Sequence, residues 1–368
     1  MPDCETKVRV IAFYLPQFHP IPENNEWWGE GFTEWTNVVK ARPLFRGHYQ
    51  PHLPADLGFY DLRVPEVREA QADLAREYGI SGFCYYHYWF EGKRPLKRPL
   101  DGMLASGKPD FPFCLCWANE NWTRKWDGMD QEVLIEQKYS ESDDLCHIEW
   151  LSEVFKDERY IRIDGRPLFL IYRISRLPDL VHRVRRWREF TEKALGQSVF
   201  LCNVESFSTE NVDPARWGLD ASVEFQPRWA DIGPRMSAAI HQRIVWRILG
   251  KTNPFLANNV YSYHDAVSRM ITLRRPQHLQ FPCVMPSWDN SARRRNGAAI
   301  FLDSNPDDFK RWLRHILQLV NVRPQEKQIV FVNAWNEWAE GNHLEPCQRW
   351  GRGYLEAVRE ALVDYAAQ

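Results

Sequence analysis

The sequence IVFVNAWNEWAEG, residues 329–341, joins a short apolar run directly to a cluster of polar and aromatic side chains. A short apolar run bounded by polar residues is typical of a buried strand. In a parallel α/β barrel, the loops that follow the carboxyl ends of the strands form the functional face. The stretch therefore predicts a strand that ends at a functional site, and the same pattern recurs along the chain.

Apolar runs of this kind occur eight times and are rich in Val, Ile, Phe and Tyr. They cover residues 8–15, 80–86, 111–117, 168–172, 199–204, 221–225, 281–285 and 329–334. Helical patterns lie between them, over residues 65–78, 145–155, 180–190, 309–320 and 354–366. Strands that alternate with helices indicate a parallel sheet. Eight such units predict an α/β fold of the closed (β/α)8 TIM-barrel type, with a doubly wound fold of two domains as the alternative.

The chain has 368 residues and no stretch rich in Gly, Ser or Pro that would divide it. We therefore expect residues 1–368 to form a single catalytic domain. Long loops are predicted after strands 1, 3 and 6, and residues 16–61 and 227–280 are the longest of these connections. Loops of this length are usually functional, so we expect them to shape the site.

Charge and composition narrow the class of partner and compartment. The chain has 47 Lys and Arg against 49 Asp and Glu, a net charge of −2, so we expect no nucleic-acid partner. It has no apolar run long enough for a membrane span, and its first residues do not read as a secretory signal. None of the eight cysteines has C-x-x-C spacing. These features together predict a cytoplasmic protein with reduced thiols.

The aromatic content points to a carbohydrate ligand. The chain has 17 Trp, 14 Tyr and 20 Phe, and many of the Trp residues stand among polar neighbours, as in NEWW at residues 25–28. The apolar C–H face of a sugar stacks on an indole ring, and its hydroxyl groups need polar partners. The alternative is that these Trp residues anchor the core while their neighbours face water. We expect an oligosaccharide or polysaccharide as the substrate.

Polar and aromatic side chains follow most of the predicted strands at the point where each strand ends. In a barrel these clusters converge on one rim, which makes them candidates for substrate binding. The candidates are Tyr14, Gln17, His19, Tyr86, His87, Trp89, Trp117, Asn119, Glu120, Trp122, Gln226, Trp288, Asp289, Trp335, Asn336 and Trp338.

Glu337 and Glu340 are the predicted catalytic residues. Three positions apart on a helical turn or a tight loop, two side chains lie on one side, about 5–6 Å apart at Cβ. Two carboxyl groups about 5–5.5 Å apart suit retaining glycoside hydrolysis, in which one group is protonated and the other ionised. Their mutual repulsion separates the two pKa values and supplies that division. The alternative is an acidic loop in which one Glu caps a helix.

Other chemistries find little support in the sequence. It contains no Walker A motif, no G-x-S-x-G elbow and no H-E-x-x-H motif. The histidines His19, His48, His52 and His87 could meet at a metal, but their spacing fits no standard site. We expect no metal and no cofactor.

Four segments resemble the WbsX-type family, which is usually labelled a glycosyltransferase and is found among polysaccharide-synthesis proteins. They read VIAFYLPQFHPIPENNEWWGEGFTEWTNV (10–38), GFCYYHYWF (82–90), FCLCWANENW (113–122) and NAWNEWAEGNHLEP (333–346). The likeness covers nearly the whole chain. Through the N-E-W-x-E-G element this family is similar in turn to glycoside hydrolase family 99, the endo-α-mannosidases and endo-α-mannanases, whose fold is a (β/α)8 barrel.

This resemblance implies a role for each carboxylate. Glu337 matches the base that acts on the sugar 2-hydroxyl, and Glu340 matches the general acid and base. It implies a retaining glycoside hydrolase that cleaves α-mannoside-like linkages through a 1,2-anhydro sugar, without a metal or an organic cofactor. A glycosyltransferase of O-antigen or capsular polysaccharide biosynthesis is the alternative, and a glycan-binding protein on an inactive barrel is a third.

Overall fold

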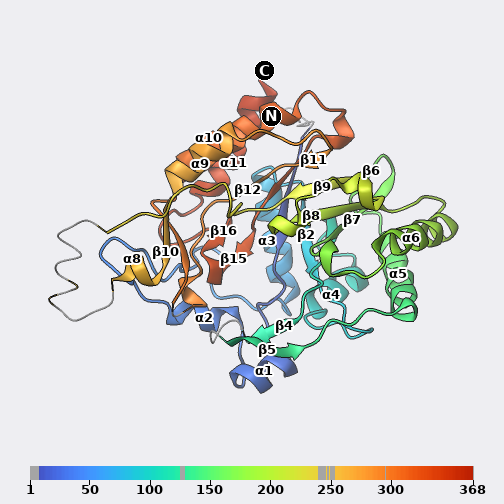
Figure 1. The fold of residues 1–368 in the computed structure, drawn as a ribbon, viewed down its shortest axis with the longest axis horizontal. Coiled ribbons are helices and arrows are strands. Elements are labelled where there is room, and N and C mark those ends of the chain that lie inside the picture. Colours follow the sequence, from blue (N-terminus) through green and yellow to red (C-terminus); the bar gives the residue numbers. More distant parts are fainter. Residues whose placement is uncertain are drawn as a thin grey trace.

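The structure is a computed structural model that describes residues 8–124, 129–238, 246, 248, 253–294 and 296–367. A nearly closed barrel of parallel strands surrounded by helices confirms the predicted (β/α)8 fold (Figure 1). Going round the barrel, its strands are β1 (Arg9–Tyr14), β2 (Gly82–His87), β3 (Phe113–Trp117), β7 (Arg166–Ile171), β8 (Phe200–Glu205), β9 (Ala221–Glu224), β11 (Gln280–Phe281), β12 (Cys283–Val284) and β14 (Ile329–Val332).

The seventh predicted strand is divided in two at Pro282. Its first half, β11, pairs with β9, and its second half, β12, pairs with β14. Proline has no N–H group to donate to a sheet ladder, so a regular strand is interrupted there. The Pro282 carbonyl oxygen still accepts a hydrogen bond of 2.8 Å from the Phe331 N–H group. These two short strands thus lie between β9 and β14, so that the ring of strands is nearly closed.

Helices connect successive strands around the barrel. They are α3 (Pro65–Glu77), α4 (Arg98–Ser106), α5 (Glu141–Phe155), α6 (Leu180–Leu195), α9 (Tyr263–Thr272), α10 (Pro306–Val320) and α11 (Gly353–Ala366). The five helices expected from the sequence are among them. Between β8 and β9, where every residue is described, the short 3-10 turns η3 (Ser208–Glu210) and η4 (Pro214–Trp217) stand in place of an α-helix. The two-residue strand β6 (Arg162–Ile163) pairs with the start of β7.

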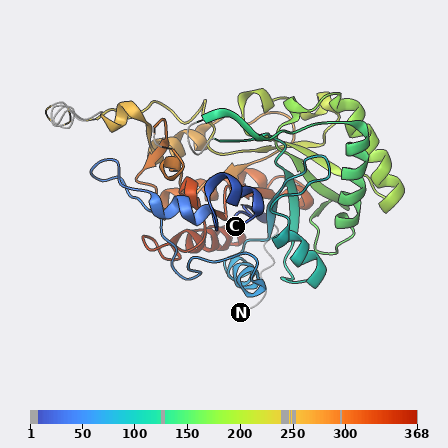
Figure 2. The ribbon, with the colours of Figure 1, turned by 90° about the horizontal axis from the view of Figure 1, so that it is seen from below.

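The long loops predicted after strands 1, 3 and 6 all carry short elements of their own. The loop after β1 holds α1 (Pro22–Trp28) and α2 (Glu34–Lys40), which Figure 2 shows in blue across the middle of the molecule. After β3 comes the hairpin of β4 (Trp122–Arg124) and β5 (Met129–Ile135), and after β9 come α8 (Pro254–Ala257) and β10 (Asn259–Ser262). The loop after β12 also extends outward, and its strand β13 (Ala299–Leu302) pairs with β10.

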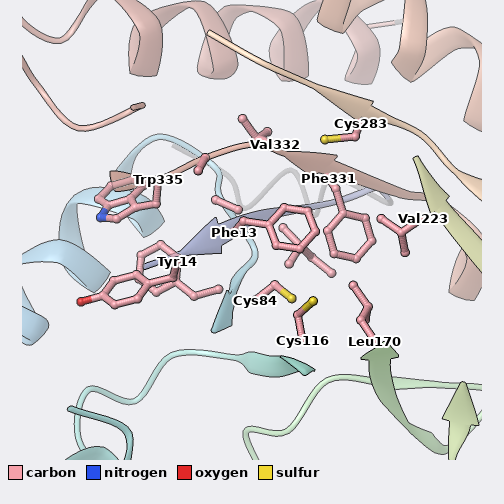
Figure 3. Close-up of a cluster of buried hydrophobic side chains, with 14 of the residues drawn as sticks. Phe13, Tyr14, Cys84, Cys116, Leu170, Val223, Cys283, Phe331, Val332 and Trp335 are labelled. Carbon is pink, nitrogen blue, oxygen red and sulfur yellow. The ribbon is translucent and has the colours of Figure 1, made fainter. Parts of the chain in front are cut away.

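The barrel interior is filled by side chains from every second position of the strands. Figure 3 shows Phe13, Cys84, Cys116, Leu170 and Phe331 together, and each of them is fully buried. Phe13 lies at the centre, with its ring centroid 5.4 Å from that of Phe331. The alternation of a strand sends its neighbour Tyr14 to the other face, where the Tyr14 hydroxyl donates to Gln71 of α3 over 2.7 Å.

Two further features of the structure concern membrane spans and cysteines. Within the described ranges, no helix combines the length and the apolar character needed to cross a bilayer. The seven cysteines in those ranges are all free thiols.

Replacing Phe13 with alanine should destabilise the barrel strongly. The substitution leaves a cavity at the centre of the packed interior, and a buried Phe→Ala change costs about 3–5 kcal/mol of unfolding free energy. Urea unfolding followed by tryptophan fluorescence measures the loss. The control is Val322→Ala at a side chain that is 89% exposed, which should change the free energy by less than about 0.5 kcal/mol. Equal effects of the two substitutions would contradict this placement of the core.

Candidate active site

A cleft of about 330 Å³ opens at the carboxyl ends of the barrel strands. Every barrel position contributes to its lining, as expected for the functional face of this fold. Its floor rests directly on the core, since the Phe13 ring lies 5.7 Å from that of Tyr86 and 5.4 Å from that of Phe225. Glu337 and Glu340 both line the cleft. The cleft is therefore the part of the described chain in which the predicted catalytic residues meet a space for a ligand.

The two glutamates lie on a tight hairpin that follows β14. Its strands β15 (Asn336–Glu337) and β16 (Asn342–His343) are antiparallel, and the 3-10 turn η7 (Trp338–Glu340) joins them. Gly341 ends the turn at φ +57°, and a Cβ there would lie 3.0–3.2 Å from atoms of Asp289. Only glycine fits this combination of left-handed backbone and close approach. The predicted tight turn thus exists, and Gly341 allows the loop after β12 to pack against it.

Arg293 forms ion pairs with both predicted catalytic carboxylates. Its Nη1 donates to Glu340 Oε1 over 2.7 Å, and its Nη2 lies 3.2 Å from Glu337 Oε2. The same Nη2 donates over 2.8 Å to Oε1 of Glu34, at the start of α2. One guanidinium group therefore contacts three carboxylates that come from two other loops of the barrel.

Burial and charge act in opposite directions on these groups. Burial raises the pKa of Glu337 to about 8, the Glu340 carboxylate adds to that rise, and Arg293 opposes it. Burial also raises the pKa of Glu34, again against the effect of Arg293. For Arg293, burial lowers the pKa, but the surrounding carboxylates outweigh this effect and hold it above the ordinary range. Glu337 is consequently a carboxyl group that holds its proton near neutral pH.

A second buried carboxylate fixes the hairpin from behind. Glu345 accepts hydrogen bonds from the Tyr60 hydroxyl (2.7 Å), Gln71 Nε2 (2.6 Å) and Trp338 Nε1 (2.6 Å). Burial raises the pKa of Glu345 to about 7. Asn336 ties the same hairpin to the end of β1, where its Oδ1 accepts from the Leu15 N–H group over 2.7 Å. Because these contacts come from β1, α3 and the loop before it, the glutamates are held by a large part of the barrel.

Five of the predicted substrate-binding residues line the cleft with the two glutamates. They are Gln17, Tyr86, Glu120, Trp122 and Trp288. They come from the ends of four different strands. Glu120 is held at the edge of the cleft by an ion pair with Arg173.

The other predicted residues lie outside the cleft lining. Several support its walls: Asn119 exchanges hydrogen bonds with the backbone of Arg173, and Trp338 packs against α2. Others face the helix layer, where His87 lies against His147 and Trp89 donates to Asp143. The full set consists of Tyr14, His19, His87, Trp89, Trp117, Asn119, Gln226, Asp289, Trp335, Asn336 and Trp338.

Sequence reasoning did not select Arg293 or Glu34. They lie in the long loops after β1 and β12, where Glu34 begins α2, and neither directly follows a strand. Several aromatic side chains of the cleft were also not selected as site residues, although some belong to the polar-aromatic clusters: Trp27, Trp28, Tyr88, Tyr172, Phe207 and Trp229. Of these, Phe207 and Trp229 are 41% and 44% exposed, so they offer ring surface at the mouth of the cleft.

Two of the four histidines considered for a metal, His48 and His52, line one small pocket with Asp289 and His343, whereas His87 faces the helix layer. His48 Nε2 lies 2.6 Å from Asp289 Oδ2, His52 faces His343, and His87 faces His147. Across the described part of the chain, no group of three or more His, Cys, Asp or Glu side chains is arranged to hold a metal ion.

Comparisons with known sequences identify relatives along almost the entire chain. The family model described as glycosyltransferase WbsX matches residues 10–358. A protein described as uncharacterized protein WxcX, from Xanthomonas campestris pv. campestris strain B100, is 44% identical over 357 residues. The match covers 96% of this chain and 49% of that protein, and the WxcX protein of strain ATCC 33913 matches equally well. The chain thus spans about half the length of the curated relatives it matches.

Comparisons with solved structures identify the same fold in glycoside hydrolases. The family 99 endo-α-mannosidase from Bacteroides thetaiotaomicron superposes with a TM-score of 0.59 at 13% identity and covers 97% of both chains. A structure described as a glycoside hydrolase-like protein gives a TM-score of 0.58 at 14% identity, covering 96% of this chain and 94% of that one. At these identities the likeness shows the fold, which is that of the family 99 barrel.

Glu337→Gln should stabilise the protein more at alkaline than at acidic pH. In the unfolded chain Glu337 loses its proton near pH 4.5, whereas in the folded protein it keeps the proton to about pH 8. The contribution of Glu337 to stability is therefore complete below pH 4.5 and is lost as the pH rises to 8. Because glutamine does not titrate, the melting temperature of the variant relative to wild type should rise by about 2 °C or more from pH 5 to pH 8.5.

Differential scanning calorimetry across this range gives the comparison. The exposed Glu26→Gln serves as the matched control. A difference for Glu337→Gln that is constant from pH 5 to pH 8.5 would contradict the raised pKa.

Proposed function

The chain belongs to the family described as glycosyltransferase WbsX, and we propose that it is a retaining glycoside hydrolase that acts on α-mannoside-like linkages. The observation that carries this proposal is the pairing of Glu337 and Glu340 on one guanidinium group at the base of an aromatic cleft. Two carboxyl groups of different protonation are what glycoside hydrolysis requires. The cleft supplies a place where a sugar can reach both.

The lining suits a neutral glycan. Its five Trp residues can stack on the C–H faces of sugar rings, and its carboxylates and amides can bind their hydroxyl groups. Among the described residues that line the cleft, Arg293 is the one Lys or Arg, and three carboxylates surround it. An anionic ligand would meet more negative than positive charge here. The charge of the site thus supports a neutral sugar and a neutral leaving group.

The reaction that we propose has two steps. In the first, Glu337 takes the proton of the sugar 2-hydroxyl while O2 attacks C1, and the bond from C1 to the leaving oxygen breaks as Glu340 protonates that oxygen. In the second, water attacks C1 as Glu340 takes its proton, and O2 leaves C1 and recovers its proton from Glu337. Each step inverts C1, so the configuration is retained overall, and both glutamates return to their starting states.

These two steps require Glu340 to be protonated and Glu337 to be ionised when the sugar is bound. In the free protein Glu337 has the raised pKa, and Arg293 holds Glu340 by its shorter contact. A carboxylate with a pKa near 8 is a stronger base than an ordinary one, which suits the weakly acidic 2-hydroxyl. The proposed mechanism therefore includes transfer of the proton from Glu337 to Glu340 when the sugar binds.

The name of the family favours a second candidate, a glycosyltransferase of O-antigen or capsular polysaccharide assembly. Such an enzyme would bind a nucleotide sugar, whose diphosphate needs cationic or N–H donors. The carboxylate-paired Arg293 is poorly suited to that task. Consumption of a nucleotide sugar by the purified protein would decide for this candidate.

Glu337→Gln and Glu340→Gln should each abolish hydrolysis. Each variant removes one of the two proton-transfer groups, and we expect losses of about 10²–10⁴-fold in kcat. The measurement is the release of reducing sugar from α-mannans and bacterial O-antigens, with nucleotide-sugar turnover followed in parallel. Glu26→Gln, at an exposed position of α1, is the matched control. Activity near wild type in either active-site variant would rule out the assignment.

A substrate that lacks the 2-hydroxyl group should bind but resist cleavage. Without that oxygen the 1,2-anhydro sugar cannot form, so Glu337 has no proton to remove. The comparison is between an aryl α-mannoside oligosaccharide and its 2-deoxy analogue at the cleaved residue, with leaving-group release measured for both. Cleavage of the 2-deoxy analogue at a comparable rate would point to direct attack on C1 by a carboxylate or by water.

A further inference from the structure

We propose that Arg293 and Glu34 act as a positioning pair that sets both the spacing and the charge balance of Glu337 and Glu340. This inference rests on the proposed function, because it assigns these two residues a role in the same site. Neither residue needs to transfer a proton. The pair acts through the contacts that Arg293 makes with the two glutamates.

Glu34 is the fixed end of this arrangement. Its side chain is fully buried, and Oε1 accepts the Arg293 hydrogen bond while Oε2 has no hydrogen-bond partner among the described residues. Its helix α2 is packed against η7, with the rings of Trp35 and Trp338 5.6 Å apart. The Trp35 indole also donates to the Tyr60 carbonyl oxygen over 2.8 Å. The packing of α2 therefore holds the backbone of Glu34 in place beside η7.

Arg293 is in turn held by the backbone of its own loop. It follows the 3-10 turn η5 (Asn290–Ala292), which begins where the Asp289 side chain accepts from the Ser291 N–H group. The Asp289 N–H group donates to the Glu340 carbonyl oxygen over 2.6 Å, and the Ser287 hydroxyl donates to the Gly341 carbonyl oxygen. The loop that carries the guanidinium is thus fastened to the turn that carries the glutamates. These contacts place Arg293 beside both glutamates.

The charges explain why Glu34 is needed as well as Arg293. With Arg293 alone, a cation between two carboxylates favours the ionised form of both, which works against retention of the proton that the leaving oxygen needs. A third buried carboxylate offsets part of that positive charge and favours retention of one proton by the pair. Glu34 raises the pKa of Glu337, although burial and Glu340 raise it more, and Arg293 lowers it.

Other ionisable groups also face the two glutamates. The tyrosines Tyr86 and Tyr88, at the end of β2, interact electrostatically with Glu337, and Tyr172 at the end of β7 interacts with Glu340. Burial raises the pKa of each of these phenols, so they stay neutral where the glutamates titrate. Among the neighbours named here, Arg293 and Glu34 are the charged side chains that can be changed without removing a predicted proton donor or acceptor.

The test is to change the two residues separately and to follow the titration of the glutamates. Arg293→Gln should raise the higher apparent pKa of the Glu337–Glu340 pair by about 1 unit or more, and Glu34→Gln should lower it. Carbon-13 NMR of the full chain with carboxyl-labelled glutamate measures both, with signals assigned from Glu337→Gln and Glu340→Gln. Arg294→Gln and the exposed Glu26→Gln are the matched controls, and neither should shift the titration.

Arg293→Lys separates the effect of charge from that of geometry. Lysine keeps the positive charge but cannot contact three carboxylates in one plane. We expect its titration to stay close to that of wild type while kcat for hydrolysis falls by about 10-fold or more. In Glu34→Gln, the rise of kcat/KM with pH should move to lower pH together with the titration.

The outcomes decide the two proposals separately. Opposite shifts in Arg293→Gln and Glu34→Gln support the positioning pair, even if no glycan is hydrolysed and the proposed function fails. Hydrolysis by the wild type, combined with unchanged titration in both folded variants, overturns the positioning pair and leaves the proposed function intact. If Arg293→Gln does not fold, Arg293→Lys and Glu34→Gln still test the positioning pair. Titration shifts in the same direction for all variants would also overturn the positioning pair.

Discussion

Three carboxyl groups can meet at the carboxyl end of this barrel because one guanidinium group lies between them. Glu34, Glu337 and Glu340 come from the loops after the first and last strands, and Arg293 comes from the loop after the seventh. Without a cation, burying three carboxylates together would be too unfavourable for the loops to close. The first loop, the hairpin that carries the two glutamates and the loop after β12 meet at this set of ion pairs.

The fold could be read from the sequence because each barrel unit repeats a simple pattern. All eight apolar runs became strands, since a strand buried on both faces needs little beyond continuous apolar residues. The division of the seventh run at Pro282 was not predicted, because an apolar run does not show which neighbouring strand each of its halves will pair with. The helix α10 was equally clear, with its Asn305 cap and Pro306 in the first turn. Such local signals determine where the strands and helices form, and the number of strands determines that they form a barrel.

The site was harder to derive, and the reason is physical. A residue that follows a strand can turn toward the cleft or toward the helix layer, and alternation along the strand decides which. Tyr86 faces the cleft and His87 faces α5 for this reason, although both stand in the same cluster. Arg293 and Glu34 are more remote still. They are brought together over 259 positions of sequence by loops whose path no local pattern encodes.

The description of the family as glycosyltransferases and the fold of family 99 hydrolases need not conflict. The two carboxylates of the proposed mechanism produce a 1,2-anhydro sugar, and any hydroxyl group can open it. Water at the cleft gives hydrolysis, whereas a sugar hydroxyl in the same place gives transfer with the same retention and the same roles for Glu337 and Glu340. Neither outcome places a diphosphate beside Arg293, whose guanidinium group already contacts three carboxyl groups. The exposed rings of Phe207 and Trp229 lie at the mouth of the cleft, where an acceptor sugar would stack. Under the proposed mechanism, a hydrolase and a transferase on this barrel would differ in how firmly the mouth of the cleft holds a second sugar against water, while the chemistry at its base would be the same for both.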